Sequence, residues 1–282
     1  MINYLVLIKA YNTADFKYWY SYHKHLIPTA RFVFLDNESA INLFELTDKK
    51  DIILPVVGFP DQHNLYNKIF NNSHLFSDGD YVIIIDDDEY LYFHDKNDNS
   101  HSCFVEDVLR QAAKPNLLVP QVLISQPTVP DSRPDKLPLP YTHIYRRNDL
   151  ATTCKSIICY NSKSKYDFTV NTSGGTRGHI PSIDGKVEGF YFTWWKKKED
   201  LVGVETLTFP VPNPPFAIVD YNSNVRLYHF HIKSKEDWKI KVERGSCAQK
   251  TPWYSSILEE NKFYGGYDTL DMDMKEQYER NA

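Results

Sequence analysis

The stretch YVIIIDDDEY, residues 81–90, joins a short apolar run directly to a cluster of acidic residues. The apolar part, 82–85, has the continuous hydrophobic pattern of a strand that is covered on both faces, as in a parallel or mixed sheet. Four carboxylates follow it: Asp86, Asp87, Asp88 and Glu89. They stand at the carboxyl end of the predicted strand, where open α/β sheets bind ligands. Like charges this close repel one another unless a cation or water lies among them.

The residues before this stretch alternate predicted strands and helices. Strands are predicted at 4–9, 31–35 and 52–57, and helices from Asn12 onward and at 60–72. Pro55 makes the third strand an edge strand, because proline cannot donate a hydrogen bond to a neighbour. Asn12 is predicted to cap the first helix, with Asp15 at the third helical position. This β-α-β-β-α-β order predicts an α/β fold with a parallel or mostly parallel sheet and helices on its faces.

The later residues predict a more elaborate half. Strands are predicted at 116–124, 155–161, 186–195 and 225–232, and a helix at 234–245. Ser234 and Asp237 form a predicted capping box, and Gly245 follows the end of the helix. The segment 125–140 holds too many prolines for a helix or a central strand.

Composition excludes several classes of protein. The chain of 282 residues is 42% hydrophobic and 24% charged, which is typical of a globular protein. A formal net charge of −5 gives no general footprint for nucleic acid. No apolar run is long enough for a signal peptide or a membrane span. The four cysteines lack CxxC spacing and indicate a reducing compartment, so we expect a soluble, cytoplasmic protein.

Asp86 and Asp88 offer hard oxygen ligands next to each other. In an extended segment, alternation would point both side chains to one side and Asp87 to the other. Two such carboxylates suit Mg²⁺ or Mn²⁺, with open positions for a substrate phosphate. A solvated acidic turn is the alternative interpretation of the same pattern.

Several segments of the chain form a longer pattern. They are DDDEY (86–90, a D-x-D-E-[FY] element), IKAYNTADFKYWYSYH (8–23, with Lys9, Trp19, Tyr22 and His23), FLDNES (34–39), Gln62 with Tyr66 and Asn67, Lys155-Ser156-Ile157, and HFHIKS…KVERG (229–245, an H-x-x-x-K-S element). These motifs resemble, in the same chain order, those of the GT-A glycosyltransferases of family 92 and its relatives. Together they span roughly residues 5 to 245. Ala10 and Tyr11 depart from the family pattern, and its F-G-x-x-G-H segment after the D-x-D has no counterpart in this sequence.

The resemblance implies a GT-A type fold, with a Rossmann-like mixed sheet and helices on both faces. It implies one domain over 1–282, with a nucleotide-binding half (1–90), a metal and acceptor half (91–245) and a peripheral C-terminal segment (246–282). It also implies a metal-dependent, inverting transferase that moves a sugar from a UDP-sugar to a saccharide acceptor. Stand-alone enzymes of this kind occur in large algal DNA viruses, and kinship with them would suggest UDP-xylose as donor and the host cytoplasm as location.

The resemblance also suggests roles for individual residues. Asp88 would bind the metal directly, Asp86 would contact the metal or the ribose, and His229 would return as a third metal ligand. The nucleotide-sugar would contact Lys9, Asp36, Lys155 and Lys233, with Lys241 and Arg244 as weaker candidates. Candidates for the base that activates the acceptor are Asp131, Asp184 and Glu188.

Other interpretations of the same residues stay open. His229 and His231 share a strand face, but no third imidazole or thiolate is placed to complete a zinc site, and His23 and His25 diverge on their helix. A metal-dependent phosphohydrolase also uses a D-x-D after a hydrophobic strand, although Tyr90 stands where it needs a small or hydroxyl residue. An inactive scaffold that binds a sugar nucleotide is the third alternative. The absence of G-x-G-x-x-G and Walker A motifs excludes dehydrogenases and P-loop enzymes.

Overall fold

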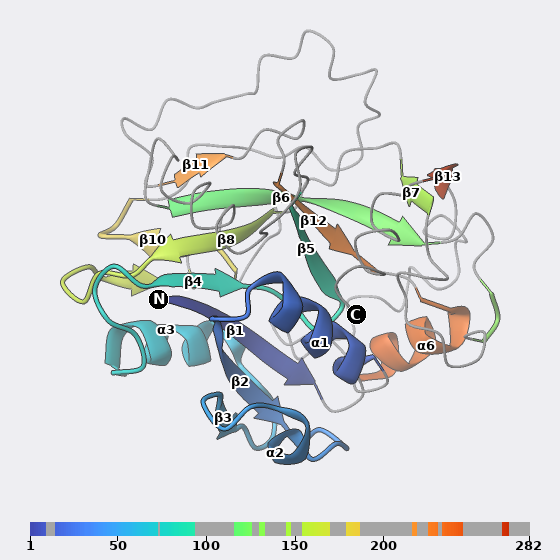
Figure 1. The fold of residues 1–282 in the computed structure, drawn as a ribbon, viewed down its shortest axis with the longest axis horizontal. Helices are drawn as coiled ribbons and strands as arrows, with labels where there is room; N and C mark the ends of the chain where they lie inside the picture. The colour runs from blue at the N-terminus through green and yellow to red at the C-terminus, as the bar shows by residue number, and fades with distance from the viewer. Residues whose placement is uncertain are drawn as a thin grey trace, which may run out of the picture.

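A mixed sheet forms the centre of the molecule (Figure 1). The computed structural model describes residues 1–9, 15–72, 74–93, 116–125, 130–132, 145–147, 154–169, 179–186, 216–218, 225–230, 233–244 and 267–270. Within these ranges the sheet has eleven strands, and a separate two-stranded hairpin accompanies it. The predicted α/β class is therefore confirmed. No helix in these ranges is long and apolar enough to cross a membrane.

The first half of the chain builds the parallel part of the sheet. Its strands are β1 (Ile2–Lys9), β2 (Arg31–Asn37), β3 (Ile52–Pro55) and β4 (Tyr81–Ile84), in the spatial order β4-β1-β2-β3. All neighbours in this set are parallel, and β3 stands at the edge as Pro55 predicts. The chain moves outward from β1 through β2 to β3 and then crosses to the other side of β1. The strand order therefore reverses between β1 and β4, and the crevice outside their carboxyl ends is the expected ligand site.

The second half of the chain extends the sheet beyond β4. Its strands are β5 (Glu89–Phe93), β6 (Asn116–Ser125), β7 (Tyr145–Arg147), β8 (Cys154–Cys159), β11 (Phe216–Ile218), β12 (Val225–His229) and β13 (Tyr267–Leu270), and the hairpin is β9 (Tyr166–Asp167) with β10 (Ser182–Ile183). β8 lies antiparallel between β4 and β6, and β12 lies between β6 and β5. The strands predicted at 116–124, 155–161 and 225–232 are thus confirmed near their predicted bounds. Of the strand predicted at 186–195, the structure describes only Lys186. Gly245 and most of the segment 125–140 also lie outside the described residues.

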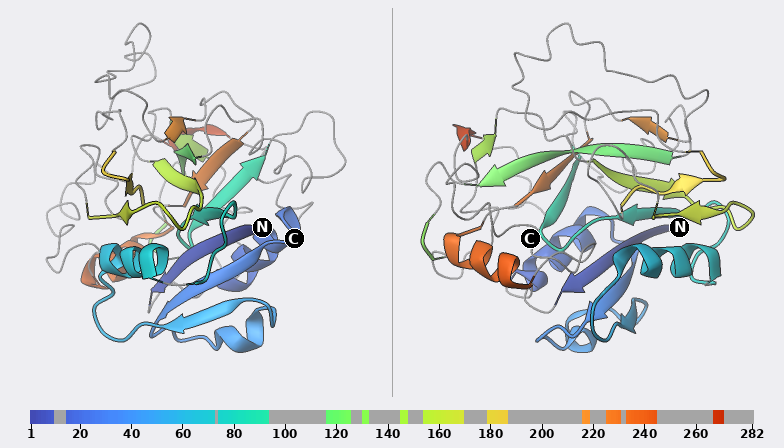
Figure 2. Two further views of the ribbon diagram at one scale, coloured as in Figure 1. Left: turned by 90° about the vertical axis from the view of Figure 1, so that its left-hand side faces the viewer. Right: turned by 180° about the vertical axis from the view of Figure 1, so that it is seen from behind.

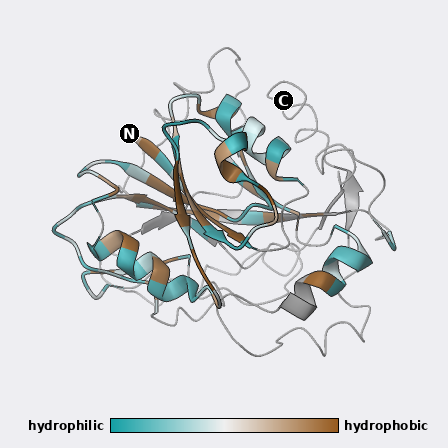
Figure 3. Cartoon of the chain, turned by 90° about the horizontal axis from the view of Figure 1, so that it is seen from below, coloured by the Kyte–Doolittle hydropathy of each residue, from teal (hydrophilic) through white to brown (hydrophobic). Residues whose placement is uncertain are grey.

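Helices cover both faces of the parallel strands, as the sequence predicts (Figure 2). The side chains of β1 point alternately to the two faces of the sheet, and each face carries its own hydrophobic cluster. Tyr4 and Val6 pack in a cluster with helix α1 (Phe16–Leu26), whereas Leu5 and Leu7 pack with helix α3 (Gln62–Asn72). Figure 3 shows the corresponding pattern, with apolar central strands and helices that mix apolar and polar residues.

The helix boundaries differ in part from the predictions. α1 begins at Phe16, with Asp15 as N-cap and no side-chain capping bond, so the helix does not start after Asn12. The short helix α2 (Leu43–Leu46) was not expected from the sequence. Helix α6 (Lys235–Arg244) confirms Ser234 as its N-cap, because the backbone N–H of Asp237 donates to Ser234 Oγ at 3.0 Å; the Asp237 carboxylate accepts from the Ser234 hydroxyl at 2.8 Å.

Side chains of α1 hold the strand that follows the acidic stretch. In the described part of the chain, β5 pairs only with β12, and α1 lies along its other edge. Trp19 Nε1 donates to the carbonyl of Glu89 and Tyr22 OH to the carbonyl of Leu91, both at 2.7 Å. The N–H of Leu91 donates to His23 Nε2 at 3.2 Å, so His23 Nδ1 carries the proton and donates to the Trp19 carbonyl. The W-x-x-Y-H element of the sequence therefore fixes the backbone of β5.

We expect Tyr22→Phe to destabilise the fold by about 1–2 kcal/mol, because the buried Leu91 carbonyl loses its donor. Tyr18→Phe is the matched control, since Tyr18 lies on the same helix with 39% of its surface exposed and should change stability by less than about 0.5 kcal/mol. Urea denaturation measures both free energies of unfolding. Equal losses in the two variants would contradict the role of Tyr22.

Candidate functional site

The acidic residues form a tight turn between β4 and β5. β4 ends at Ile84, Asp87 and Asp88 lie in the turn, and β5 begins at Glu89. The N–H of Glu89 donates to the Asp86 carbonyl at 3.2 Å, and the N–H of Asp86 donates back to Glu89 Oε2 at 2.8 Å. The prediction of an extended segment with strictly alternating side chains is therefore wrong, because this reciprocal pair of hydrogen bonds turns the chain. Asp87 is buried at 2% exposure.

Lys155 supplies a positive charge beside the run of carboxylates from Asp86 to Glu89, which would otherwise repel one another. The antiparallel register pairs Ile83 with Ile157, so Lys155 in β8 lies alongside the end of β4. Its Nζ lies 2.7 Å from Asp86 Oδ2 and 3.2 Å from Glu89 Oε1. A third contact runs to His179 Nε2 at 2.9 Å. The three N–H groups of the ammonium thus have three acceptors, although the residue is only 4% exposed.

These contacts set the charge of the buried groups. Burial alone would raise the pKa of Asp86, but the positive charges of Lys155 and Lys9 outweigh it and hold that pKa well below its usual range. Burial raises the pKa of Glu89, and Lys155 offsets this only in part. Burial, reinforced by Lys155, lowers the pKa of His179 to about 3. His179 is therefore neutral near pH 7, with Nε2 as the acceptor for Lys155.

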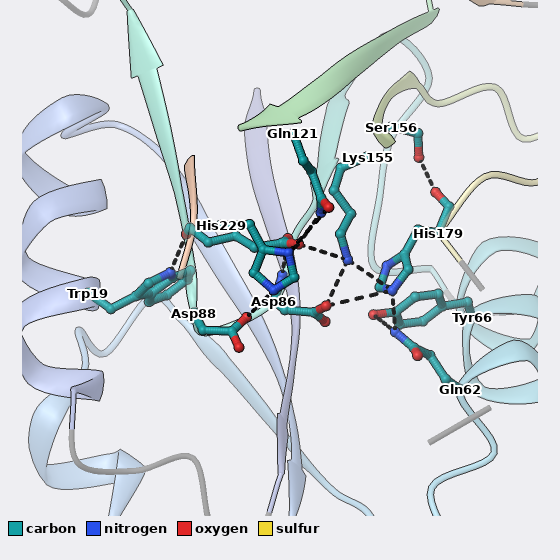
Figure 4. Close-up of polar contacts among 11 residues, drawn as sticks. Trp19, Gln62, Tyr66, Asp86, Asp88, Gln121, Lys155, Ser156, His179 and His229 are labelled. Atoms are coloured by element: carbon teal, nitrogen blue, oxygen red, sulfur yellow. Dashed lines mark hydrogen bonds and ion pairs between the residues drawn. The ribbon is translucent and has the colours of Figure 1, made fainter. Parts of the chain in front are cut away.

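Asp88 and His229 form a second cluster on the other side of Asp86 (Figure 4). The cross-strand register pairs His229 of β12 with Glu89 of β5. His229 Nε2 lies 3.5 Å from Asp88 Oδ1, and Nδ1 lies 3.2 Å from Gln121 Oε1. Gln121 also donates its amide N–H to Glu89 Oε1, which fixes the amide oxygen as the acceptor for His229 Nδ1–H. His229 Nε2 therefore faces Asp88.

The geometry of this cluster suits a metal ion. One ligand atom from each of Asp88, Glu89 and His229 lies within 4.8 Å of the others. Carboxylate oxygen and imidazole nitrogen are common ligands of divalent metals. The identity of the metal does not follow from these three residues.

A polar chain leads from Lys155 toward helix α3. Gln62 Nε2 lies 3.4 Å from His179 Nε2 and donates to Tyr66 OH at 3.0 Å. Ser156 Oγ donates to the His179 carbonyl and so fixes the backbone that carries the imidazole. His179 is thus held from its ring and from its backbone (Figure 4).

The predicted nucleotide-binding residues occupy several positions. Lys9 ends β1 and acts electrostatically on Asp86. Asp36 lies in β2, near its end, where its carboxylate accepts the N–H of Ser39 at 3.0 Å. Lys233 contacts Asp15 at the start of α1, at 3.3 Å.

The candidate bases are not brought to the acidic turn by any contact that the described residues show. Asp131 has a side chain that is 91% exposed and pairs with Lys235 at 2.7 Å. Asp184 has φ 53° in an exposed turn and accepts bonds from Ser164 and Lys165. The third candidate base, Glu188, lies outside the described residues, as do His231 and the side chains of Lys241 and Arg244.

Sequence reasoning missed three groups in this site. Glu89 was included in the motif but received no role, and Gln121 and His179 were not considered. A polar residue within the apolar run 116–124 was the available signal for Gln121. His179 follows a glycine-rich segment and carried no comparable signal.

Comparisons with known proteins assign no family. No protein-family model matches the sequence, and no curated protein matches it. The solved structure of HddC from Yersinia pseudotuberculosis aligns with a TM-score of 0.32 and 12% identity, covering 85% of this chain and 97% of the HddC chain. A similarity of this size assigns neither the fold nor an activity.

We expect stability to fall as the pH drops from about 6.5 toward 3, because His23 and His179 stay neutral in the folded chain while the unfolded chain takes up protons. Burial lowers the pKa of each to about 3. Each histidine then contributes up to about 1.4 kcal/mol per pH unit in this window.

The contribution of His23 can be isolated by His23→Gln, which should lower the slope of the unfolding free energy between about pH 5.5 and 4 by roughly one proton. His25→Gln is the control, because His25 is exposed on the same helix. Urea denaturation across this range measures both slopes. An unchanged slope in His23→Gln would contradict the assignment.

Proposed function

We propose that the chain is a metal-dependent glycosyltransferase that moves a sugar from a UDP-sugar to a saccharide acceptor, with Mn²⁺ or Mg²⁺ as its ion. The observation that carries this proposal is the Asp88–His229 pair, 3.5 Å apart, beside the point where the strand order reverses between β1 and β4. The motif resemblance to family 92 GT-A enzymes adds the reaction class, which the geometry alone does not specify.

The contacts of His229 indicate which atoms would hold the ion. Its Nδ1–H is taken by Gln121, so a neutral ring presents the lone pair of Nε2 to the Asp88 carboxylate. A divalent cation placed between these two atoms would be bound by both of them. With ligand bonds of about 2.1 Å, two adjacent ligands lie about 3.0–3.4 Å apart, close to the separation found here. Glu89 Oε1 lies 3.8 Å from His229 Nδ1, on the side of the ring away from the proposed ion, and so helps to orient the imidazole.

Asp86 offers a further oxygen. Its Oδ2 contacts Lys155, whereas its Oδ1 is buried and has no hydrogen-bond partner among the described residues. A buried carboxylate oxygen without a partner is costly, and an ion or a ligand hydroxyl would satisfy it. The proposed ligand set is therefore Asp88 and His229, with Asp86 Oδ1 directed at the same ion or at its substrate.

The residues at the carboxyl ends of the neighbouring strands fit a nucleotide donor. Lys9 at the end of β1 brings a positive charge to this edge, and Asp36 in β2 brings a carboxylate. When bound, the divalent ion would stabilise the negative charge that develops on the departing diphosphate. We propose an inverting reaction and place UDP-xylose first among the donors to be tested.

A donor screen tests the activity. UDP release is measured from a panel of UDP- and GDP-sugars, with Mn²⁺, with Mg²⁺ and after EDTA. We expect turnover of a UDP-sugar that EDTA abolishes. Turnover without a divalent ion would reject the metal role, hydrolysis of a phosphate ester instead would favour a phosphohydrolase, and binding without transfer would favour an inactive scaffold.

Asp88→Asn should weaken Mn²⁺-dependent UDP binding at least about tenfold, because the ion loses a charged ligand. Asp78→Asn is the matched control, since Asp78 is an exposed carboxylate before the opposite end of the same strand, β4. Calorimetric titration of UDP with and without Mn²⁺ measures both. Equal UDP affinities in the two variants would remove Asp88 from the site.

A further inference from the structure

We infer that Lys155 is a built-in counter-ion that restricts the acidic turn to a single divalent cation and weakens the affinity for it. The inference rests on the proposed metal site, and it assigns to Lys155 a role in selecting the number and affinity of ions rather than in holding the nucleotide.

The position of the ammonium supports this role. Lys155 Nζ lies between Asp86 Oδ2 at 2.7 Å and Glu89 Oε1 at 3.2 Å. A divalent ion bridging these two carboxylates would occupy the same place, because it would require the same two oxygens. Asp86 Oδ1 is not engaged by Lys155, and with Asp88 and His229 Nε2 it belongs to the ligand set proposed above for an exogenous ion. The carboxylates of Asp86, Asp88 and Glu89 thus divide into a part neutralised by the protein itself and a part that can receive a metal.

The surroundings of Lys155 hold it in place. The residue comes from β8, which has strands on both sides, and its side chain is 5% exposed. The neutral ring of His179 accepts its third N–H at 2.9 Å, and Ser156 and Gln62 hold His179 in turn. A flexible surface lysine would move aside for an incoming ion at little cost. This lysine would have to give up two hydrogen bonds and the ion pair with Glu89 in a buried environment.

The charge of Lys155 also acts on the neighbouring metal position. Glu89 Oε1 lies 3.2 Å from Lys155 Nζ and 3.8 Å from His229 Nδ1. The ammonium and the proposed metal ligand His229 therefore contact the same carboxylate oxygen. Repulsion between like charges over such a distance is poorly screened where the groups are buried. A neutral residue at position 155 would remove this repulsion and release two carboxylate oxygens as ligands.

The test is Mn²⁺ binding to the full chain without nucleotide, measured by calorimetry and by electron paramagnetic resonance of the free ion. The wild type should bind one Mn²⁺ at this site. Lys155→Met and Lys155→Gln should bind Mn²⁺ at least about tenfold more tightly, or bind a second ion. Lys155→Arg, which keeps the charge, should retain one ion with an affinity within about threefold of wild type.

The matched control is Lys235→Met, which removes a lysine that pairs with the exposed Asp131. It should leave Mn²⁺ binding unchanged. A purely structural ion pair predicts loss of stability in Lys155→Met with the same number and affinity of ions, and that result would overturn the inference. A second Mn²⁺ bound at the acidic turn of the wild type or of Lys155→Arg would also overturn the inference. This outcome can be measured even if Lys155→Met and Lys155→Gln do not fold.

Failure of the inference can be told apart from failure of the proposed function. A wild-type chain that binds no Mn²⁺ overturns both. If Asp88→Asn abolishes Mn²⁺ binding but the variants of Lys155 bind the same number of ions with the same affinity as wild type, only the role of Lys155 is overturned.

Discussion

The buried ion pairs of Lys155 with Asp86 and Glu89 are the constraint on which the rest of the site depends. Carboxylates that end a strand inside a protein repel each other and lose hydration, so the turn needs a fixed cation. β8 supplies it, because its antiparallel register brings Lys155 to the end of β4. Removing one partner of such a buried pair typically costs about 3–5 kcal/mol, since an uncompensated charge is left behind.

The aromatic face of α1 is the second support of the acidic turn. Trp19 and Tyr22 donate to backbone carbonyls of β5, one of them the carbonyl of Glu89 itself. The position of the Glu89 carboxylate, and through it that of Gln121 and Lys155, therefore depends on a helix that lies about 70 residues earlier in the chain. The aromatic residues in this segment support the site through packing and hydrogen bonding.

Local patterns predicted most of the fold and only part of the site. The strands around Leu5 and Val33, the edge strand with Pro55 and the capping box at Ser234 follow from periodicity and from residue-specific backbone chemistry, which act over a few positions. The start of α1 and the turn at Asp87–Asp88 did not follow: α1 begins after Asp15, and a hydrogen bond between the Asp86 N–H and the Glu89 side chain turns the chain after β4, which the alternation of side chains does not indicate. Lys155 and Asp86 are 69 residues apart, so their contact depends on strand order and register.

The acidic residues of the site and its lysine and histidines come from different parts of the chain. The four carboxylates end the parallel, N-terminal part of the sheet, whereas Lys155, His179 and His229 are added by β8, by the segment before β10 and by β12. The N-terminal strands alone would carry the acidic turn with Lys9 nearby but without Lys155, His179 and His229. Folding of the later strands onto β4 and β5 therefore both neutralises the turn and completes the cluster of Asp88, Glu89 and His229. In this arrangement the same strand pairings that stabilise the sheet also bring together three side chains that could hold a metal ion.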